Sequence, residues 1–330
     1  FLNVNTVSDS STMFARRVVE ILASGTNIIS TKSLALEELF PGIVFITKHE
    51  EETRNYLEVL TNNEELLRRR SVKGIRTVYD NHLYQHRFEF ILNKIGFNIQ
   101  NNLNDGVSIV ASTKRPSCLD NLLNNYATQS WENKELIVVL NSRDFDIDVV
   151  KEKVSKYKNV TIVECYDKSL GYCLNKGIEV SNYEYIAKFD DDDFYGPDYI
   201  KDSMHAFLYS DASIVGKKSI FMYFESNTAL ALKYPNTENK YQDFVYGATL
   251  MFKKDVWRKS QFKDLNRGED SNFLKDALSN GFRIFSTNPY NYTYVRQKSE
   301  HHTWIVDDFQ LLRKSKVIGY MDDYKKHVTV

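Results

Sequence analysis

The amino-acid sequence predicts an α/β protein in two parts, each built on a mostly parallel sheet with flanking helices. Short apolar runs typical of strands alternate with amphipathic helical segments along most of the 330 residues. A polar, turn-rich stretch at 99–106 divides this alternation into two series. A chain of this length is enough for about two domains. We therefore expect a Rossmann-like half-domain at 1–98, a linker at 99–106 and a second domain at 107–330.

Composition and charge limit the classes of protein that this chain can belong to. Hydrophobic residues make up 42% of it and aromatic residues 13%, which is enough for a sizeable core and argues against global disorder. The net charge of -1 gives no support for a nucleic acid partner. No apolar run has the length of a transmembrane segment, and no signal peptide is visible. Peripheral association with a membrane surface stays open.

The cysteines indicate the compartment. Cys118, Cys165 and Cys173 form an odd set without metal-ligand spacing, which favours free thiols in a reducing setting. The sequence therefore predicts a cytoplasmic location, with the inner face of the membrane as the other site considered. The chain begins with Phe1 on an expected strand, so we expect it to be part of a longer or trimmed product.

The first part should contain three short strands and four main helices. Ser10, Ser11 and Thr12 offer a helix N-cap, and Gly25 fits the end of the helix that follows. The expected strands are 2–7, 27–30 and 43–46; the expected helices are 12–23, 50–60, 64–73 and 82–95, with a helical turn at 35–39.

The second part reads as β-α-β-α-β-α-β with short connections. This order predicts a parallel sheet with right-handed crossovers. Pro197 suits the first turn of the helix that follows the last of these strands. The expected strands are 107–111, 134–140, 160–164 and 185–189, and the expected helices are 119–128, 147–157, 171–180 and 197–209.

Polar side chains follow the strands of this second sheet at their carboxyl ends, where ligands bind in such folds. Because several loop ends converge there, we expect a nucleotide pocket at this edge. The residues expected to line it are Ser112, Thr113, Arg115, Asn141, Lys168 and the acidic run that begins at Asp190.

Four consecutive carboxylates, Asp190, Asp191, Asp192 and Asp193, follow an apolar strand. Adjacent like charges repel, so the run gains stability from a cation nearby. Oxygen ligands suit a hard divalent ion, and Mg²⁺ is usually held by one or two carboxylates plus substrate phosphates. The run therefore predicts a site for Mn²⁺ or Mg²⁺ bound to a diphosphate. A solvated acidic turn is the alternative.

Three later features are further candidates. An expected strand at 246–252 opens with Gly247, where a ligand can approach the backbone closely, unless this glycine serves packing alone. Glu269 and Asp270 stand at the start of an expected helix, where acids are favoured by the helix dipole and a plain cap is one interpretation. A late loop carries His302 and Trp304, with an ordinary surface loop as the alternative.

The first part resembles the C-terminal half of a GT-B glycosyltransferase in the run 17–26 and in 30–31 and 37–40. This resemblance implies that Glu20 matches the glutamate that holds the ribose of the donor nucleotide. A complete GT-B enzyme has two Rossmann-like halves with the site between them, so we expect this half to be catalytically silent here. The alternative for Glu20 is a helix ion pair with Arg16.

The second part resembles glycosyltransferase family 2 over 107 to about 310. The resemblance lies in 107–110, 134–139, 170–178 and the acidic run, followed by Glu269-Asp270. It implies the GT-A fold and transfer of a sugar, with inversion, from a nucleotide diphosphosugar.

The same resemblance implies roles for individual residues. Asp190 and Asp191 would contact the donor, with Asp190 on the ribose side, and Asp192 would ligate the metal. Asp270 would be the catalytic base, while Glu269 orients the acceptor or its loop. The stretch at Gly247 would lie beside the donor sugar, and His302 and Trp304 would close over the metal or diphosphate. The family usually has Asp at the position of Asn141, which leaves the contact to the base open.

Together these features predict a metal-dependent, inverting hexosyl- or N-acetylhexosaminyl-transferase that uses a UDP-sugar. The acceptor would be a hydroxyl on a glycan or another cell-surface or secondary product. A nucleotide-sugar-binding or scaffold part of a larger bifunctional glycosyltransferase, itself catalytically silent, is the second hypothesis. A nucleotidyltransferase is the third, and it fits less well because the loop 112–115 offers one Lys and one Arg in place of a Gly-rich basic loop.

Overall fold

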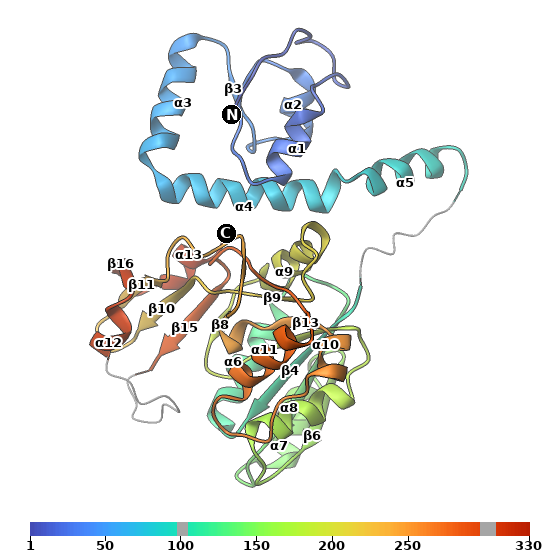
Figure 1. Cartoon of the computed structure of the whole chain (residues 1–330). Helices are drawn as coiled ribbons and strands as arrows, with labels where there is room; N and C mark the ends of the chain where they lie inside the picture. Colours follow the sequence, from blue (N-terminus) through green and yellow to red (C-terminus); the bar gives the residue numbers. More distant parts are fainter. Residues whose placement is uncertain (98–104, 298–307) are drawn as a thin grey trace. The chain divides into compact units, whose positions relative to one another are not determined.

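Residues 1–97, 105–297 and 308–330 are described by a computed structural model (Figure 1). The chain divides into two units, one running from Phe1 to Asn101 with Val330 and the other from Asn102 to Thr329. Each unit is built around its own sheets and core, so the two are considered separately below.

The first unit has a parallel sheet with strand order β1-β2-β3. Val18 and Leu22 of one helix pack with Ile28, Phe40 and Val78 in its core. Helix α4 continues well beyond the predicted end, past Gly74, whose missing side chain leaves room for Leu22. The elements are β1 (Leu2–Asn3), α1 (Arg17–Ala23), β2 (Ile29–Thr31), α2 (Leu34–Leu39), β3 (Phe45–Thr47), α3 (Glu50–Asn62), α4 (Glu64–Asn81) and α5 (Tyr84–Lys94).

The start of α1 differs from the sequence prediction. The helix begins at Arg17, not at 12, and Arg16 precedes it without a side-chain cap. The carbonyl of Ser10 instead accepts from the N–H of Ala35, near the start of α2. The polar residues that suggested an N-cap for α1 therefore belong to a segment that satisfies the first turn of another helix.

The second unit is organised around a large sheet with strand order β12-β14-β9-β13-β7-β4-β5-β6 in its described residues. Strands β7, β4, β5 and β6 are parallel to one another, as predicted. Strand β13 joins β7 in the antiparallel direction. The strands of this sheet are β4 (Val107–Thr113), β5 (Lys134–Leu140), β6 (Val160–Glu164), β7 (Tyr185–Lys188), β9 (Ile214–Gly216), β12 (Lys240–Gln242), β13 (Met251–Lys253) and β14 (Ile284–Ser286).

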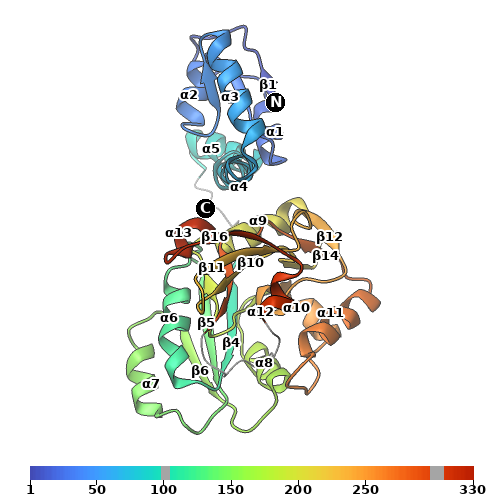
Figure 2. The same ribbon diagram turned by 90° about the vertical axis from the view of Figure 1, so that its left-hand side faces the viewer.

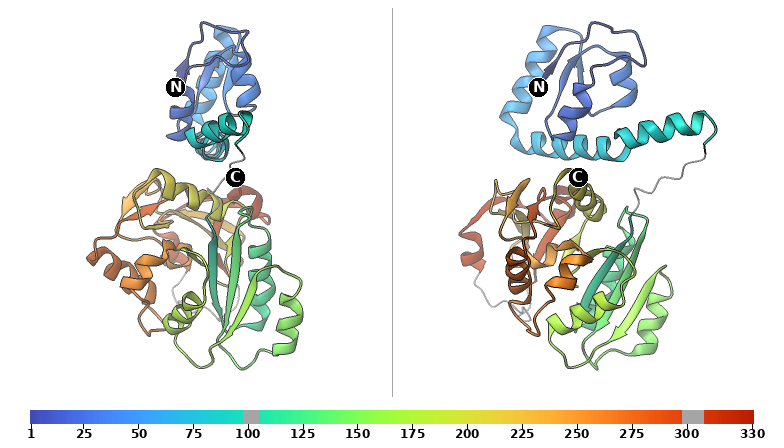
Figure 3. Two further views of the ribbon diagram at one scale, coloured as in Figure 1. Left: turned by 90° about the vertical axis from the view of Figure 1, so that its right-hand side faces the viewer. Right: turned by 45° about the vertical axis from the view of Figure 1, so that its right-hand side comes forward.

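Helices cover both faces of this sheet, which gives the second unit its layers (Figures 2 and 3). Figure 2 shows α6 and α7 on one side of β4, β5 and β6, and α8 on the other. Successive residues of β4 alternate between two cores, since Ile109 packs on the α6 side and Val110 on the α8 side. The helical elements of the unit are η1 (Pro116–Cys118), α6 (Leu119–Ala127), α7 (Ile147–Val154), α8 (Leu170–Glu179), α9 (Tyr199–Tyr209), η2 (Gly247–Thr249), α10 (Lys254–Lys259), α11 (Glu269–Ser279), α12 (Asp308–Leu312) and α13 (Tyr324–Val328).

A second sheet in the described residues of this unit has strand order β16-β11-β10-β15-β8 (Figure 1). Its strand β8 directly follows the acidic run in the chain, so this sheet is connected to the acidic turn. Its strands are β8 (Phe194–Tyr195), β10 (Ile220–Phe224), β11 (Ala229–Lys233), β15 (Tyr292–Arg296) and β16 (Ser315–Tyr320).

The predicted strand 246–252 is wrong in its first half. Residues Gly247–Thr249 form the 3₁₀ turn η2, and the strand β13 begins at Met251. The hydroxyl of Thr249 donates to the carbonyl of Tyr246 at 2.7 Å and accepts the N–H of Lys217 at 2.8 Å. These bonds replace ladder bonds and hold the turn.

Three amide side chains on and just after α6 hold the acidic turn and the segment after it. Asn121 Nδ2 donates to the carbonyls of Asp191 and Asp193 at 2.9 and 3.0 Å. Asn125 Nδ2 donates to the Asp193 carbonyl at 2.9 Å. Gln129 continues the row at the next helical spacing: its Nε2 donates to the carbonyl of Gly196 at 3.0 Å. The row fixes the backbone of the turn independently of its carboxylates.

We predict that Gln129→Ala lowers the free energy of unfolding by about 2 kcal/mol, because it leaves buried backbone groups without partners. Besides Gly196, the side chain serves Ile200, whose N–H donates to Gln129 Oε1 at 3.2 Å. Urea unfolding followed by circular dichroism measures the effect. Asn124→Ala, at an exposed position of α6, is the matched control and should change stability little. Equal effects of the two substitutions would contradict the structural role of Gln129.

Candidate active site

The four carboxylates at the carboxyl end of β7 do not share one environment. Asp191 and Asp193 are buried at 5% and 2% exposure. The side chains of Asp190 and Asp192 retain 39% and 23% exposure. Alternate residues of the run therefore point inward and outward, which separates their charges.

The inward carboxylates are each bonded to the protein. Asp191 accepts from Thr113 Oγ1 at 2.5 Å and forms an ion pair with Arg115. Asp193 accepts from the hydroxyl of Tyr292 at 2.5 Å and from the N–H of Val295 at 3.1 Å. Burial raises the pKa of Asp193 well above its ordinary value, and its two hydrogen bonds oppose that rise.

Asp192 and Asp190 remain partly open, and each meets one cation. Arg115 reaches Asp192 Oδ2 at 2.9 Å, in addition to its pair with Asp191. Burial and the neighbouring Asp191 raise the pKa of Asp192, and Arg115 opposes this. Asp190 Oδ1 accepts from Lys188 Nζ at 2.7 Å. Asp192 thus offers an oxygen ligand in a strongly acidic surrounding, which is the donor type that Mg²⁺ and Mn²⁺ prefer.

Lys188, at the end of β7, joins the acidic turn to the start of α11. Its side chain is 3% exposed, and Nζ lies 2.7 Å from Asp190 Oδ1 and 3.3 Å from Asp270 Oδ2. Burial by itself lowers the pKa of Lys188, but the two carboxylates outweigh burial and raise it. The ammonium is therefore charged and offsets part of the negative charge of the site.

Asp270 lies against the backbone of Gly247. A Cβ at position 247 would stand 1.7 Å from Asp270 Oδ2, so the approach requires glycine. The other oxygen, Asp270 Oδ1, is buried without a hydrogen-bond partner. Burial raises the pKa of Asp270, while Lys188 lowers it. A buried carboxylate with one oxygen bound and the other unpartnered can accept a proton from a ligand.

Glu269 precedes Asp270 and is 5% exposed. Burial, followed by the charge of Asp270, raises its pKa to about 7. Its Cβ would lie 3.4 Å from a side chain placed at Gly171, at the start of α8. Glu269 is thus held inside the protein, between two helices, as a carboxyl group that titrates near neutral pH.

The structure places the other predicted residues at the same edge but with different surroundings. Ser112, near the end of β4, is half-buried, and Lys168 is exposed. Asn141 is 3% exposed, and its Nδ2 donates to the carbonyl of Lys168 at 2.9 Å while its Oδ1 accepts from the same residue's N–H. The Asn141 amide therefore fixes the loop of Lys168, a bond that the sequence did not suggest.

The second predicted metal ligand and one predicted donor contact belong to the late loop. His302 and Trp304 lie outside the described residues. Within 1–97, 105–297 and 308–330, no group of three His, Cys, Asp or Glu side chains could hold a metal ion. In the first unit, Glu20 pairs with Arg16 at 2.9 Å on the surface, which matches the alternative considered for it.

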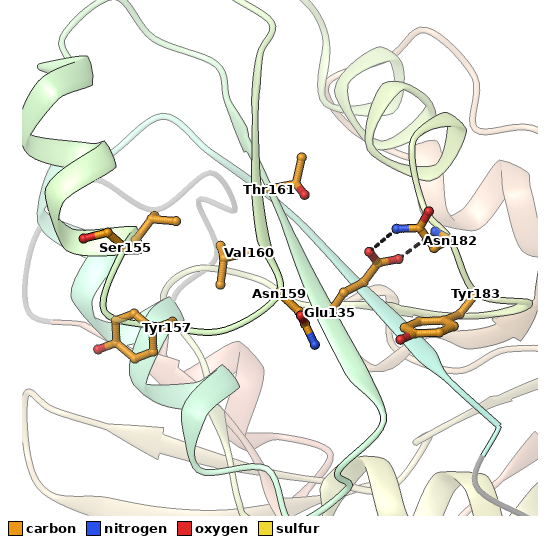
Figure 4. A pocket seen from close by; sticks show the side chains of 9 residues that line it. Glu135, Ser155, Tyr157, Asn159, Val160, Thr161, Asn182 and Tyr183 are labelled. Atoms are coloured by element: carbon orange, nitrogen blue, oxygen red, sulfur yellow. Dashed lines mark hydrogen bonds between the residues drawn. The ribbon is translucent and has the colours of Figure 1, made fainter.

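A polar hollow of about 380 Å³ lies at the opposite edge of the sheet (Figure 4). Figure 4 shows Glu135 at its wall, bonded to Asn182. Glu135 accepts from Ser108 Oγ, from Asn182 N–H and from Asn182 Nδ2 at 2.5, 2.6 and 2.6 Å. Both carboxylate oxygens of Glu135 accept hydrogen bonds, so this residue joins strands β4 and β5 to the loop of Asn182.

Comparison with known proteins shows the family to which this chain belongs. Residues 108–317 match the family described as "Glycosyl transferase family 2". This chain belongs to glycosyl transferase family 2. Its GT-A fold, with the acidic turn at the carboxyl end of the parallel strands, agrees with the prediction. Residues 1–93 match a second family, described as "Glycosyl transferase-like".

Individual relatives of this family 2 chain share part of its length. It is 34% identical over 84 residues, or 25% of the chain, to "Putative glycosyltransferase EpsH" of Bacillus subtilis (strain 168). The match covers 23% of EpsH, so the chain spans about a quarter of that relative.

Solved structures show similar partial coverage. S. aureus TarS 1–349 in complex with UDP-GlcNAc has a TM-score of 0.49 at 18% identity, covering 59% of this chain and 60% of that chain. Mannosyltransferase PcManGT from Pyrobaculum calidifontis in complex with GDP-Man and Mn²⁺ has a TM-score of 0.47 at 13% identity, covering 65% of each chain.

Two further findings complete the description of the family 2 chain. Among the described residues, none of the helices combines the length and hydrophobicity needed to cross a membrane. All three cysteines are free and buried.

The sequence analysis missed Lys188 and the residues that hold the acidic turn. Tyr195 accepts the N–H of Asp190 at 2.8 Å and donates to the carbonyl of Ala248 at 2.6 Å, which joins the turn to η2. The sequence signal for Lys188 is a lysine inside an apolar strand, two residues before the acidic run. A buried lysine needs a carboxylate partner, which this lysine has.

We predict that Asp193→Ala lowers the free energy of unfolding by about 3 kcal/mol, since it strands the hydroxyl of Tyr292 and the N–H of Val295 inside the protein. Asp192→Ala, one residue earlier and partly exposed, is the matched control and should change stability by less than about 1 kcal/mol. Thermal unfolding of both variants measures the difference. A larger loss for Asp192→Ala would contradict the division into inward and outward carboxylates.

Glu269 should make the protein less stable as pH rises. Its pKa is about 7 in the folded chain, against an ordinary value of 4.5. The folded state therefore binds one more proton than the unfolded state between these values, and stability falls with rising pH across that window. The loss at pH 8 relative to pH 4.5 is about 3 kcal/mol for this group.

Glu269→Gln should remove that loss, so that its melting temperature falls less than that of the wild type between pH 5 and 8. Differential scanning calorimetry at several pH values measures it. Glu179→Gln, at an exposed position of α8, is the control and should keep the wild-type pH dependence. Parallel curves for wild type and Glu269→Gln would rule out a raised pKa at this position.

Proposed function

We propose that the second unit is a metal-dependent, inverting glycosyltransferase. It moves a hexosyl or N-acetylhexosaminyl group from a nucleotide diphosphosugar, a UDP-sugar, to a hydroxyl of a glycan or another cell-surface or secondary product. The observation that carries this proposal is the unpartnered, buried Oδ1 of Asp270, whose other oxygen, Oδ2, lies against Gly247 and is joined through Lys188 to the acidic turn.

Asp270 is the proposed base. A sugar hydroxyl is a weak nucleophile, and a carboxylate within hydrogen-bond reach removes its proton as the new bond to carbon forms. The attacking hydroxyl and the departing diphosphate then lie on opposite faces of the donor sugar, so a single displacement inverts the configuration. Glu269, buried beside Asp270, orients the acceptor or its loop in this proposal.

The donor binds along the edge formed by the ends of β4, β5 and β7. Asp190, with its partly open carboxylate, contacts the ribose. Asp191 acts through its bonds to Thr113 and Arg115, which hold the floor of the donor site. The remaining proposed donor contacts are Ser112, Asn141, Lys168, Gly247 and Trp304.

Asp192 would hold Mn²⁺ or Mg²⁺, with His302 as the second proposed ligand. The bound ion would supply positive charge to the leaving diphosphate. One or two carboxylates together with substrate phosphates are a usual ligand set for Mg²⁺, which fits the partly open carboxylate of Asp192. Arg115, which lies 2.9 Å from Asp192, gives a second cation close to the diphosphate.

The three buried, free cysteines support the proposed cytoplasmic location, because thiols stay reduced there. A position at the inner face of the membrane is part of the same proposal.

A catalytically silent, nucleotide-sugar-binding or scaffold part of a larger bifunctional glycosyltransferase is the second candidate. One observation favours it. Glu20, which would hold the donor ribose in a GT-B enzyme, lies on the surface of the first unit in an ion pair with Arg16. That arrangement fits a half-domain without its own donor site.

We predict that Asp270→Asn lowers turnover by about 100-fold or more, because the amide cannot accept the proton. The assay measures UDP release from a panel of UDP-sugars with Mn²⁺, with and without added glycan acceptors. Asp276→Asn on the same helix, whose carboxylate pairs with Lys263 near the surface, is the matched control and should keep wild-type turnover. Gly247→Ala should reproduce the loss, since a Cβ there displaces the Asp270 carboxylate.

Wild-type turnover in Asp270→Asn would overturn the assignment of the base. Tight binding of UDP in a calorimeter, with no turnover of any donor in the panel, would instead favour the silent, sugar-nucleotide-binding candidate. A requirement for the metal is tested by adding a chelator, which should abolish turnover until Mn²⁺ is restored.

A further inference from the structure

Lys188 occupies a position that the family resemblance did not assign. It is the last residue of β7, it is 3% exposed, and its ammonium contacts two carboxylates from separate elements. Burying an ammonium is costly unless it is paired and hydrogen-bonded. A lysine in such a place, between the acidic turn and α11, acts on the carboxylates that it touches.

We propose that Lys188 is a positioning residue, which selects the reactive oxygen of Asp270 and keeps that carboxylate ionised. This inference rests on the proposed function, in which Asp270 is the base. It adds a residue outside the acidic run and outside the Glu269-Asp270 pair.

The first argument is orientation. Asp270 Oδ2 is the oxygen that faces both Lys188 Nζ, at 3.3 Å, and the backbone of Gly247. Asp270 Oδ1 is buried and has no hydrogen-bond partner. Lys188 and Gly247 therefore hold one oxygen from two sides, which leaves the buried, unpartnered oxygen as the one that can still accept a proton. Without the ammonium, the carboxylate loses the contact that distinguishes its two oxygens.

The second argument is charge. The titratable groups that face Asp270 are Lys188 from β7, Asp190 from the acidic turn and Glu269 from its own helix. Lys188 is the cation of this set, and it also neutralises Asp190 at 2.7 Å. When a buried carboxylate loses its cationic partner and keeps carboxylate neighbours, it tends to bind a proton. A protonated Asp270 cannot act as a base.

The pairing can be tested without any sugar donor, by a thermodynamic cycle. The variants are Lys188→Met, Asp270→Asn and the double variant, each measured by its melting temperature. Lys188→Met alone should lower the melting temperature by several degrees, about 5 °C or more, because it leaves two carboxylates without their cation. In the Asp270→Asn background the same substitution should cost clearly less, because one of those carboxylates is gone.

Lys217→Met is the matched control for removing a buried lysine from the same unit. Lys217 is 1% exposed, and its Nζ donates to the carbonyl of Asn288 at 2.6 Å. Its effect on melting temperature should be the same with and without Asp270→Asn. Additive effects of Lys188→Met and Asp270→Asn would overturn the proposed pairing, whatever the protein catalyses.

The second arm uses turnover of the best UDP-sugar in the panel. Lys188→Met should lower kcat by about 30-fold or more while donor KM changes by about threefold or less, because Asp270 is disturbed more than donor binding. The acidic limb of the pH–kcat profile of Lys188→Met should move to higher pH by about one unit or more. Lys188→Arg should restore part of the activity. An unchanged pH profile, or a loss confined to KM, would overturn the positioning role.

The two arms separate the two proposals. If no donor is turned over but the cycle shows coupling, the proposed function fails and the Lys188–Asp270 pairing stands. If Asp270→Asn abolishes turnover but the cycle is additive and Lys188→Met keeps wild-type kcat, the proposed base stands and the role of Lys188 is wrong.

Discussion

The arrangement of the site depends on one constraint, the repulsion among carboxylates gathered at one end of β7. The structure meets it by giving three of the buried acids a partner. Asp193 is bonded to Tyr292, Asp191 to Arg115, and one oxygen of Asp270 to Lys188. Once these pairs are formed, what remains open is small and specific. It comprises the outward members of the acidic run, Asp190 and Asp192. The second oxygen of Asp270 is buried but has no hydrogen-bond partner.

The antiparallel neighbour of β7 is the second determinant of the site. Because β13 runs beside β7, the turn η2 that precedes β13 lies next to the acidic turn. This places Gly247 against Asp270 and the carbonyl of Ala248 on the hydroxyl of Tyr195. The parallel strands alone would supply the sheet edge at which the donor is proposed to bind. The antiparallel addition brings the start of α11, and with it the proposed base, to that edge.

The sequence predicted the parallel strands better than it predicted the contacts between separate segments of the chain. Short apolar runs predicted the parallel strands with boundaries close to those found, since both faces of β4 and β5 are buried by helices. The strand expected at 246–252 was wrong because bonds from Thr249 to distant backbone replaced the ladder. The contact of Asn141 with Lys168 was likewise invisible, since it joins residues from two loops.

The sequence by itself determined the alternation of strands and helices, the acidic run at a strand end and the Glu269-Asp270 pair at a helix start, because these depend on neighbours along the chain. Which carboxylate is buried, which cation it meets and which oxygen stays free were decided by the tertiary structure alone. The physical reason is that burial and charge pairing act through space. Lys188 and Asp270 are far apart in sequence, and their charges meet only when β7 and α11 pack at the same edge.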